Sequence, residues 1–420
     1  RAPRAGLRRG GAGARDMTVA ARQVRGNPAR NRQRRRERSV APVDYALLVC
    51  ALGLVAFGFV MVSSASMSIA STCCDDPFYY VTRHGLALGL ALTGAVLAYN
   101  VPLDWWERGG VWLFLLGLVS LVLVLVPGVG REVNGATRWI PLGPLNVQPS
   151  ELVKLFATIY VSGYLVRHAD DVVNRISGFI RPMILIGIAG ALILQQPDFG
   201  TTAVMLATVM GLLFLGGVSL MPFVVLFLVV AAGLLVLVVI SPYRLQRVTS
   251  FLDPFQDPFN TGYQLSQALI AFGRGEWLGV GLGNGIQKQF FLPEAHTDFL
   301  ASVVGEELGL VGMLALIAAF AFLTWRAFSI GARAQAVGKH FAAYVAQGIG
   351  LGLGLQAFVN IGVNVGMLPT KGLTLPFMSY GSNSLIAACM AIAILLRIDA
   401  TVRRIQAEDR PERGQPWVRA

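Results

Sequence analysis

The chain alternates between long apolar runs and short breaks that hold charged, glycine or proline residues. Two of the runs, Val111–Val126 and Pro222–Ile240, contain no charged residue. A helix needs roughly 20 residues to cross the hydrocarbon core of a bilayer, so such runs predict membrane-spanning helices. The pattern predicts about ten spans, near residues 45–64, 84–101, 111–128, 151–167, 179–195, 200–217, 221–241, 299–324, 341–366 and 383–397.

The composition agrees with a membrane protein and excludes a water-soluble globule. Of the 420 residues, 55% are hydrophobic and only 14% are charged, whereas soluble domains carry about 25% charged residues. A β-barrel would show alternating polar and apolar residues in segments of about ten, and these runs are continuous. We therefore predict an all-α polytopic membrane protein with helices one to seven in 44–241 and helices eight to ten in 299–397.

The net charge of +12 is concentrated before the first apolar run. Residues 1–43 hold 13 Arg against Asp16 and Glu37. Such a polar segment cannot bury enough apolar surface to fold alone, and next to a membrane span it suits anionic lipid. We expect a disordered cytoplasmic tail, with Met17 as an alternative start, and no nucleic-acid partner. Residues 398–420 form a second arginine-containing tail.

The predicted orientation follows from the span count and from the distribution of basic residues. An even number of spans places both termini on one side, and the arginine-rich ends make that side cytoplasmic. Residues 242–298 then form the longest external loop, between the seventh and eighth spans. Tyr263–Phe272 has the pattern of a short amphipathic helix, so we expect this loop to be re-entrant or to lie on the membrane. An ordinary soluble loop is the alternative.

This orientation leaves nine basic residues on or near the outer face. The positive-inside rule predicts few there, so they either extend to the interface or converge on an anionic ligand such as a lipid diphosphate. Cys73 and Cys74 lie in a short outer loop, and neighbouring cysteines bridge each other only with strain, so we assign them no role. The nine basic residues are Arg83, Arg131, Arg138, Lys154, Arg244, Arg247, Arg274, Lys288 and Lys371.

Four stretches combine polar residues with the ends of apolar runs. The first, "NGATRWIPLGPLNVQPSELVKLFATIY", places Glu151 and Lys154 three residues apart on one helix face, where they can pair for a structural or a functional reason. The others are "QQPDFGTTAV", "LPEAHTDF" followed by "GEELG", and "NVGMLPTKGLTLPFMSYGSNSL". The last is a Gly/Pro-rich outer loop that ends in small hydroxylated residues.

In this order and at these spacings, the four stretches resemble the SEDS family (shape, elongation, division and sporulation) of polytopic peptidoglycan glycosyltransferases. The resemblance covers roughly residues 44–397, and "MLPTKGLTLPF" resembles its cell-division members most. The departures are "YGSNS" in place of the more usual "YGGSS" and the arginine-rich leader.

The resemblance implies polymerisation of lipid II, an undecaprenyl-diphosphate disaccharide-pentapeptide, during septal wall synthesis at the bacterial inner membrane. It also implies a class B penicillin-binding protein as transpeptidase partner, alongside other division proteins. The family's catalytic aspartate falls on Asp298 of "HTDF". The candidate diphosphate or substrate-binding residues are Arg138, Glu151, Lys154, Lys371 and Ser379.

Inverting transfer from a sugar diphosphate needs a base for the acceptor hydroxyl and positive charge for the departing diphosphate. Asp298 suits the first role, although burial would raise its pKa and a following helix N-terminus would lower it. Arg138 and Lys371 suit the second role. Lys154 contacts phosphate or holds the shape of the groove. A divalent cation, Mg or Mn, could bridge Asp298 and the diphosphate, but the sequence contains no dedicated ligand cluster.

Three other titratable residues near Asp298 are assigned different roles. His296 is expected to form hydrogen bonds at the interface, not to act as the base. Glu306 and Glu307 follow on the same helix, and we expect them to be paired or hydrogen-bonded within the protein.

Two rival functions are a lipid II flippase and a non-enzymatic division scaffold. A flippase favours ionisable groups at the middle of the membrane, whereas here the charges gather on the outer side. A scaffold could act through the arginine-rich tail, but it leaves the outer acids and bases unexplained. We therefore favour the transferase.

Overall fold

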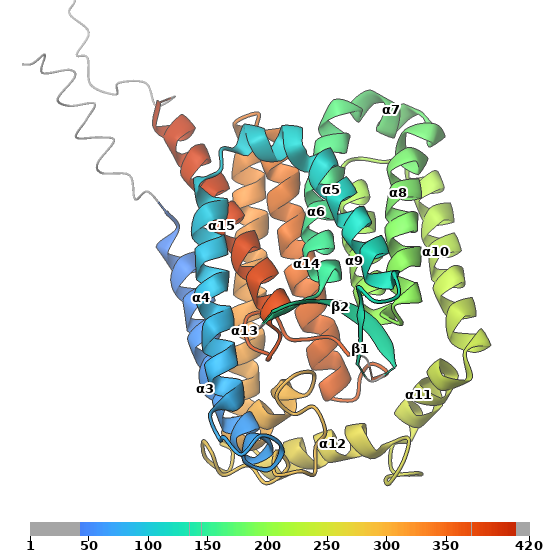
Figure 1. The fold of residues 1–420 in the computed structure, drawn as a ribbon. Coiled ribbons are helices and arrows are strands. Elements are labelled where there is room, and N and C mark those ends of the chain that lie inside the picture. The colour runs from blue at the N-terminus through green and yellow to red at the C-terminus, as the bar shows by residue number, and fades with distance from the viewer. Residues whose placement is uncertain (1–42, 134, 144, 371, 409–420) are drawn as a thin grey trace, which may run out of the picture. The chain divides into compact units, whose positions relative to one another are not determined.

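Ten long helices form the framework of the computed structural model, which describes residues 43–408 except 134, 144 and 371. Each predicted span falls on one of these helices, and they run antiparallel through a single bundle (Figure 1). Val43–Val402 form one compact unit. The helices are α3 (Tyr45–Cys73), α4 (Tyr79–Asn100), α5 (Leu103–Leu125), α6 (Pro149–Arg167), α8 (Ile176–Gln195), α9 (Phe199–Leu215), α10 (Leu220–Ile240), α13 (Leu300–Ala336), α14 (His340–Asn364) and α15 (Ser382–Glu408).

Within the described part of the chain, eight of these helices are long and apolar enough to cross a membrane by length and composition. The other two are α6, which carries Glu151 and Lys154 in its first turns, and α9, which has only 17 residues. The prediction of a polytopic helical membrane protein is confirmed. A short helix, α7 (Ala169–Asn174), connects α6 to α8.

A small antiparallel sheet between α5 and α6 departs from the all-α prediction. Its strands are β1 (Arg131–Val133), β2 (Ala136–Leu142) and β3 (Leu145–Val147), in the order β1-β2-β3. Gly135 and Gly143 stand at the two turns with φ of +74° and +62°, a conformation that glycine adopts without steric cost. The sheet was not predicted because its strands are too short to stand out as apolar runs in the sequence.

The long connection between α10 and α13 contains two helices, α11 (Pro242–Leu252) and α12 (Tyr263–Gly275). The predicted amphipathic helix at 263–272 therefore exists, and α12 packs against α13. Both helices lie across one end of the bundle in Figure 1. Their relation to a lipid surface stays a prediction.

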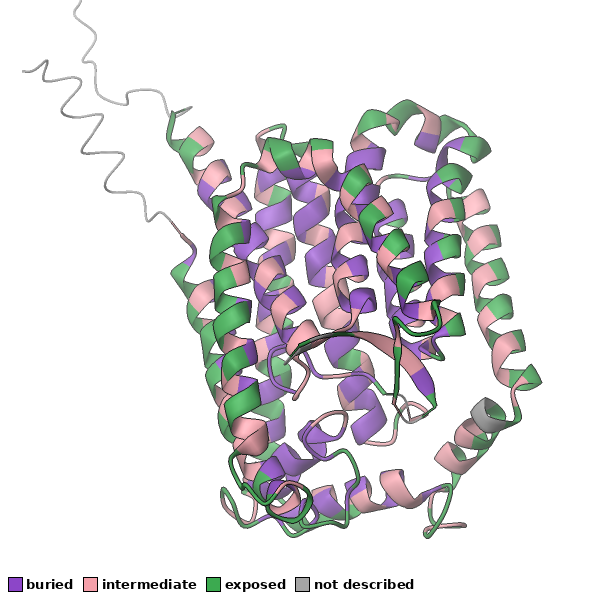
Figure 2. Cartoon of the chain, viewed as in Figure 1, coloured by how far each residue is buried: buried purple, intermediate pink, exposed green. Residues whose placement is uncertain are grey.

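One part of the bundle core is formed by α6, α14, α15 and the facing sides of α3 and α13, and a second part by α5, α6, α8 and α9; Figure 2 shows buried residues in purple. α10 has no buried residue. Two ion pairs, Arg326–Asp44 and Arg333–Asp399, connect the second half of α13 to the start of α3 and to α15. The start of α3 and the later part of α15 therefore lie at the same end of the bundle, opposite α12.

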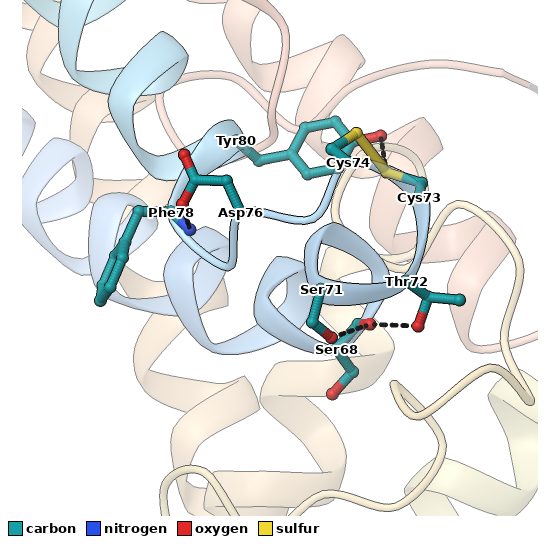
Figure 3. The surroundings of a disulfide bond; sticks show 8 residues. All are labelled: Ser68, Ser71, Thr72, Cys73, Cys74, Asp76, Phe78 and Tyr80. Carbon is teal, nitrogen blue, oxygen red and sulfur yellow. Dashed lines mark hydrogen bonds between the residues drawn. A yellow bond between two sulfur atoms is a disulfide. The ribbon is translucent and has the colours of Figure 1, made fainter.

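α3 is longer than its predicted span, which ends at residue 64. The helix continues through a Ser/Thr-containing segment to Cys73, where side-chain hydroxyls such as that of Ser71 donate back to helix carbonyls (Ser71 Oγ to Ser68 O, 2.9 Å). At its end, the structure joins Cys73 and Cys74 by a disulfide (Figure 3). This bond differs from the expectation that neighbouring cysteines stay unbridged.

Candidate active site

A polar cavity of about 1110 Å³ opens at the end of the bundle where α11 and α12 lie. It is bordered by α4, β2, α9, α11 and the segments on either side of residues 298 and 380. Asp298, Arg138 and Glu151 line it, so the structure brings together three of the predicted site residues from widely separated parts of the sequence.

Asp298 lies two residues before α13 and is held through its backbone. Its carbonyl oxygen accepts hydrogen bonds from Asn360 Nδ2 at 2.9 Å and from Asn364 Nδ2 at 3.0 Å, both on α14. Asn364 Oδ1 in turn accepts from the backbone N–H and the hydroxyl of Ser302 on α13, at 3.1 and 2.7 Å. These contacts fix the Asp298 backbone and leave its carboxylate in the cavity wall.

The Asp298 carboxyl has a pKa of about 7. Burial is the largest cause of the increase; Glu294 and Asp198 raise the pKa further, and Arg138 and Arg247 lower it. The sequence left open whether burial or a helix N-terminus prevails, and in the structure burial does. A carboxylate with this pKa can hold or release a proton near neutral pH.

Arg138, on β2, connects the sheet to the turn between α8 and α9. Its Nε donates to Gln196 O at 2.9 Å and its Nη2 to Pro197 O at 2.6 Å. The guanidinium is therefore held in one orientation at the cavity wall, close enough to lower the pKa of Asp298. A fixed guanidinium can bind phosphate oxygens with little loss of side-chain entropy.

Lys154 points into the bundle and not into the large cavity. Its Nζ lies 3.0 Å from Glu151 Oε2 and donates to Gln356 Oε1 at 2.7 Å. With Glu151, Lys154 also lines a smaller, mostly apolar cavity of about 60 Å³ between α6, α9, α14 and α15. Of the two roles that the spacing left open for Lys154, this geometry supports the structural one.

Ser379 lies in a buried turn close to the cavity-lining residue Tyr380. Its hydroxyl accepts from Leu375 N at 2.9 Å and is buried in a turn, and among the described residues Ser379 is absent from the cavity lining. The hydroxyl therefore stabilises a turn, and the substrate contact predicted for Ser379 stays a prediction. Lys371 lies outside the described residues.

Arg247, one of the nine basic residues predicted near the outer face, is a cavity residue that the sequence does not single out. Arg247 lies on α11, lines the cavity and donates from Nη1 to Thr370 O at 3.4 Å. Asp198, in the "QQPDFGTTAV" stretch, also lines the cavity and caps α9 by accepting from Thr201 N at 3.1 Å. The basic, amphipathic pattern of α11 was the signal that could have singled out Arg247.

Of the other titratable residues near Asp298, the two glutamates are paired as predicted, whereas the hydrogen bonding predicted for the His296 side chain is not seen, since its Nδ1 is buried without a hydrogen-bond partner among the described residues. His296 is buried between the rings of Tyr80 and Tyr380, at 4.9 and 5.5 Å between centroids, and burial lowers its pKa. Glu306 pairs with Arg274 and Glu307 with Lys288. In the described part of the chain, no three His, Cys, Asp or Glu side chains form a group that could hold a metal ion.

Comparisons with known proteins agree on one family. Residues 45–404 match the model of the cell cycle protein family of FtsW, RodA and SpoVE. The chain is 73% identical to a probable peptidoglycan glycosyltransferase FtsW of Allochromatium vinosum over 92% of its own length and 96% of the relative. It is 54% identical to that of Nitrosococcus halophilus, over 86% and 93%.

Two solved structures are similar to the fold. One, described as coordinating polymerisation and crosslinking in a peptidoglycan synthase complex, superposes with a TM-score of 0.69 at 30% identity, covering 86% of this chain and 98% of that one. The rod shape determining protein RodA of Thermus thermophilus superposes at 0.63 and 30%, with the same coverage. The predicted SEDS resemblance is therefore confirmed: the chain belongs to the cell cycle protein family of FtsW, RodA and SpoVE.

Proposed function

We propose that this chain is a peptidoglycan glycosyltransferase that polymerises lipid II into glycan strands by inverting transfer during septal wall synthesis. Its relatives in Allochromatium vinosum and Nitrosococcus halophilus carry the name of such an enzyme. The observation that carries the proposal is Asp298, a carboxyl with a pKa of about 7 in a polar cavity beside Arg138 and Arg247.

In the proposed reaction, the ionised carboxylate of Asp298 accepts the proton of the acceptor sugar's 4-hydroxyl. The freed oxygen attacks the anomeric carbon of the donor sugar, and the bond from that carbon to the diphosphate oxygen breaks with its electron pair on the diphosphate. A base with a pKa near the working pH is ionised often enough and still binds a proton well. The configuration at the anomeric carbon is inverted, because the attack is a direct displacement.

Arg138 and Arg247 are the proposed partners of the leaving diphosphate. Both line the cavity and both lower the pKa of Asp298, which places their positive charge near the reacting carboxylate. Their attraction to phosphate oxygens strengthens as the leaving group gains negative charge, so it lowers the barrier and not only the energy of the bound substrate. Lys371 stays a proposal from the sequence alone.

A divalent cation such as Mg²⁺ or Mn²⁺ is proposed only as an ion that binds together with the substrate. The described residues do not group three metal-ligating side chains, so a dedicated ion site does not fit them. Asp298 would share such an ion with the diphosphate oxygens, and the ion would supply positive charge there. The steps above need no ion.

We further propose that the cavity faces outward and that both termini are cytoplasmic, with the protein in the inner membrane at the septum. The start of α3 and the later part of α15 lie at the bundle end opposite α12, and the predicted arginine-rich tail precedes α3. A class B penicillin-binding protein and other division proteins are the proposed partners, since a solved structure similar to this chain is a peptidoglycan synthase complex.

The flippase and the scaffold are weaker candidates. A flippase would need ionisable groups available to a headgroup within the bundle. Glu306 and Glu307, two acids within a predicted span, are instead engaged by Arg274 and Lys288. A scaffold gives no reason for a carboxyl with a pKa of about 7 in a cavity.

The test is polymerisation of labelled lipid II by the purified full-length protein with its transpeptidase partner, with Mg²⁺, Mn²⁺ or a chelator in separate arms. Asp298→Asn is expected to abolish polymer while binding of the partner is kept. Asp253→Asn, which changes an exposed acid of the same long connection, is the matched control and is expected to be active. Near-normal polymer from Asp298→Asn would refute the proposal, and flipping of fluorescent lipid II by that variant would favour the transporter.

A further inference from the structure

Two adjacent carboxylates on α13 are completely buried and bind a neighbouring segment of the chain. Glu306 and Glu307 have no exposed surface. Glu306 Oε1 accepts from Ile286 N at 2.8 Å and from Arg274 Nη1 at 3.0 Å, and its Oε2 accepts from Gln287 N at 3.1 Å. One carboxylate thus binds two successive backbone N–H groups of the loop that leads to Asp298.

Glu307 binds the same loop a few residues earlier. Its Oε2 accepts from Gly283 N at 3.0 Å, and its Oε1 from Lys288 Nζ at 2.5 Å and Ser64 Oγ at 3.0 Å. Lys288 also donates to Ser64 Oγ at 2.6 Å, so the pair is anchored to α3. Buried carboxylates of this kind need several donors, because each unsatisfied charge would be costly in a low-dielectric interior.

The loop approaches the two carboxylates so closely that only glycine fits at one position. A Cβ at Gly285 would lie 2.9 Å from Glu306 Oε2 and 3.1 Å from Glu307 Oε1. The segment 283–288 is therefore wrapped around the two carboxylates, which we call the carboxylate clamp (Glu306 and Glu307).

α13 is interrupted directly after the carboxylate clamp. Gly309 has φ of +64° inside the helix, so residues 300–308 form a separate short helix. The preceding loop satisfies the backbone groups freed at this break, as non-helical backbone within a membrane protein requires. The bonds are Val280 N to Glu306 O (3.0 Å), Gly281 N to Glu307 O (3.0 Å), Leu310 N to Glu276 O (2.9 Å) and Val311 N to Trp277 O (3.2 Å).

This arrangement couples the clamp to Asp298 from both sides. The short helix 300–308 begins two residues after Asp298 and ends in the clamp, while the clamped loop 283–288 precedes Asp298 by ten residues. Because α13 is broken at Gly309, the short helix is not a continuous extension of the rest of that span. The position of the Asp298 carboxylate in the cavity thus depends on the clamp and on the asparagines of α14.

We propose that Glu306 and Glu307 are positioning residues for the reaction: by binding the backbone of 283–288, they hold the Asp298-bearing segment where its carboxylate meets the acceptor hydroxyl. The inference rests on the proposed glycosyltransferase function. It assigns the two acids neither proton transfer nor contact with substrate. A displacement of about 1 Å at a reacting group is enough to lower turnover about 100-fold.

The test compares Glu307→Gln with the double variant Glu307→Gln/Lys288→Met in the full-length protein, using labelled lipid II and hydrogen–deuterium exchange. The single variant leaves the Lys288 ammonium buried without its carboxylate. We expect its kcat to fall about tenfold or more, with KM within about twofold, and exchange at 283–288 to accelerate about tenfold. The double variant removes the unpaired charge, and its amide can still accept from Gly283 N, so we expect it to regain much of the kcat.

The matched control is Asp399→Asn, which removes a buried carboxylate paired with Arg333 near the other end of α13. It is expected to keep kcat and exchange at 283–288. The proposal is overturned if Glu307→Gln leaves kcat unchanged, if it changes KM alone, if exchange at 283–288 does not respond, or if Asp399→Asn lowers kcat equally. Absence of polymer from the unmodified protein would instead refute the proposed function, and the exchange experiment would still test the clamp.

Discussion

Lys154 and Glu151 form an ion pair that is directed into the helix bundle, with Lys154 Nζ 3.0 Å from Glu151 Oε2 and 2.7 Å from Gln356 Oε1. Glu151 lines both the polar cavity and the smaller apolar cavity behind it. The pair therefore forms part of the wall between them. Its contribution to activity is expected to come through the shape of that wall.

Lys154→Met is expected to destabilise the protein by about 3–5 kcal/mol, because Glu151 keeps a buried charge without its partner. Glu151→Gln/Lys154→Met removes both charges and is expected to recover most of that stability, together with polymerase activity. Thermal unfolding in detergent and polymerisation of labelled lipid II measure the two effects. A double variant that is stable but inactive would show that Lys154 contacts substrate.

The rate of polymerisation is expected to rise with pH through about 7, because Asp298 must be ionised to accept a proton and its pKa is about 7. Besides burial, four charged groups shift the pKa of Asp298: Glu294 and Asp198 raise it, and Arg138 and Arg247 lower it. Removing a positive one, as in Arg247→Ala, raises the pKa and moves the rise to higher pH; Glu294→Gln moves it to lower pH. Single-turnover rates across the pH range measure the shift. A profile unaffected by both changes would exclude Asp298 as the titrating group.

Asn364→Leu is expected to lower kcat about tenfold or more, since it removes one of the two hydrogen bonds to the carbonyl of Asp298 and leaves Ser302 without its acceptor. Each buried polar group left unsatisfied also costs about 1–3 kcal/mol of stability. The control is Asn100→Ala, at the end of α4. It removes an exposed side chain that donates to a backbone carbonyl of its own helix. Equal kcat losses in the two variants would contradict the anchoring role of Asn364.

Gly309→Ala is expected to prevent stable folding or to lower the unfolding temperature strongly. The residue has φ of +64°, and a Cβ would lie 2.4 Å from Gly279 N, so relief requires the backbone to move. Gly233→Ala in α10 meets nothing within 4 Å and is expected to be neutral or to stabilise by about 1 kcal/mol. Unfolding in detergent distinguishes the two, and an unaffected Gly309→Ala would refute the strained break.

Much of the helical framework could be predicted from the sequence, because membrane burial requires long apolar runs whose backbone bonds are satisfied within each helix. The predicted span near 151–167 agrees with α6, and the span near 383–397 lies within α15, which continues to Glu408. The amphipathic helix at 263–272 and the pairing of Glu306 and Glu307 followed from local pattern and from the cost of buried charge. The β-sheet was not predicted, because its strands are short and its turns depend on Gly135 and Gly143.

By itself, the sequence determined the class of protein, the order of its helices and the motif that carries Asp298, since these depend on residues close together along the chain. Only the tertiary structure decided which groups surround Asp298. Arg138, Arg247 and Asp198 come from separate elements, and their distances to its carboxylate depend on how those elements pack. Electrostatic and desolvation effects depend on distance in space, so the pKa of about 7 could not be derived from sequence spacing.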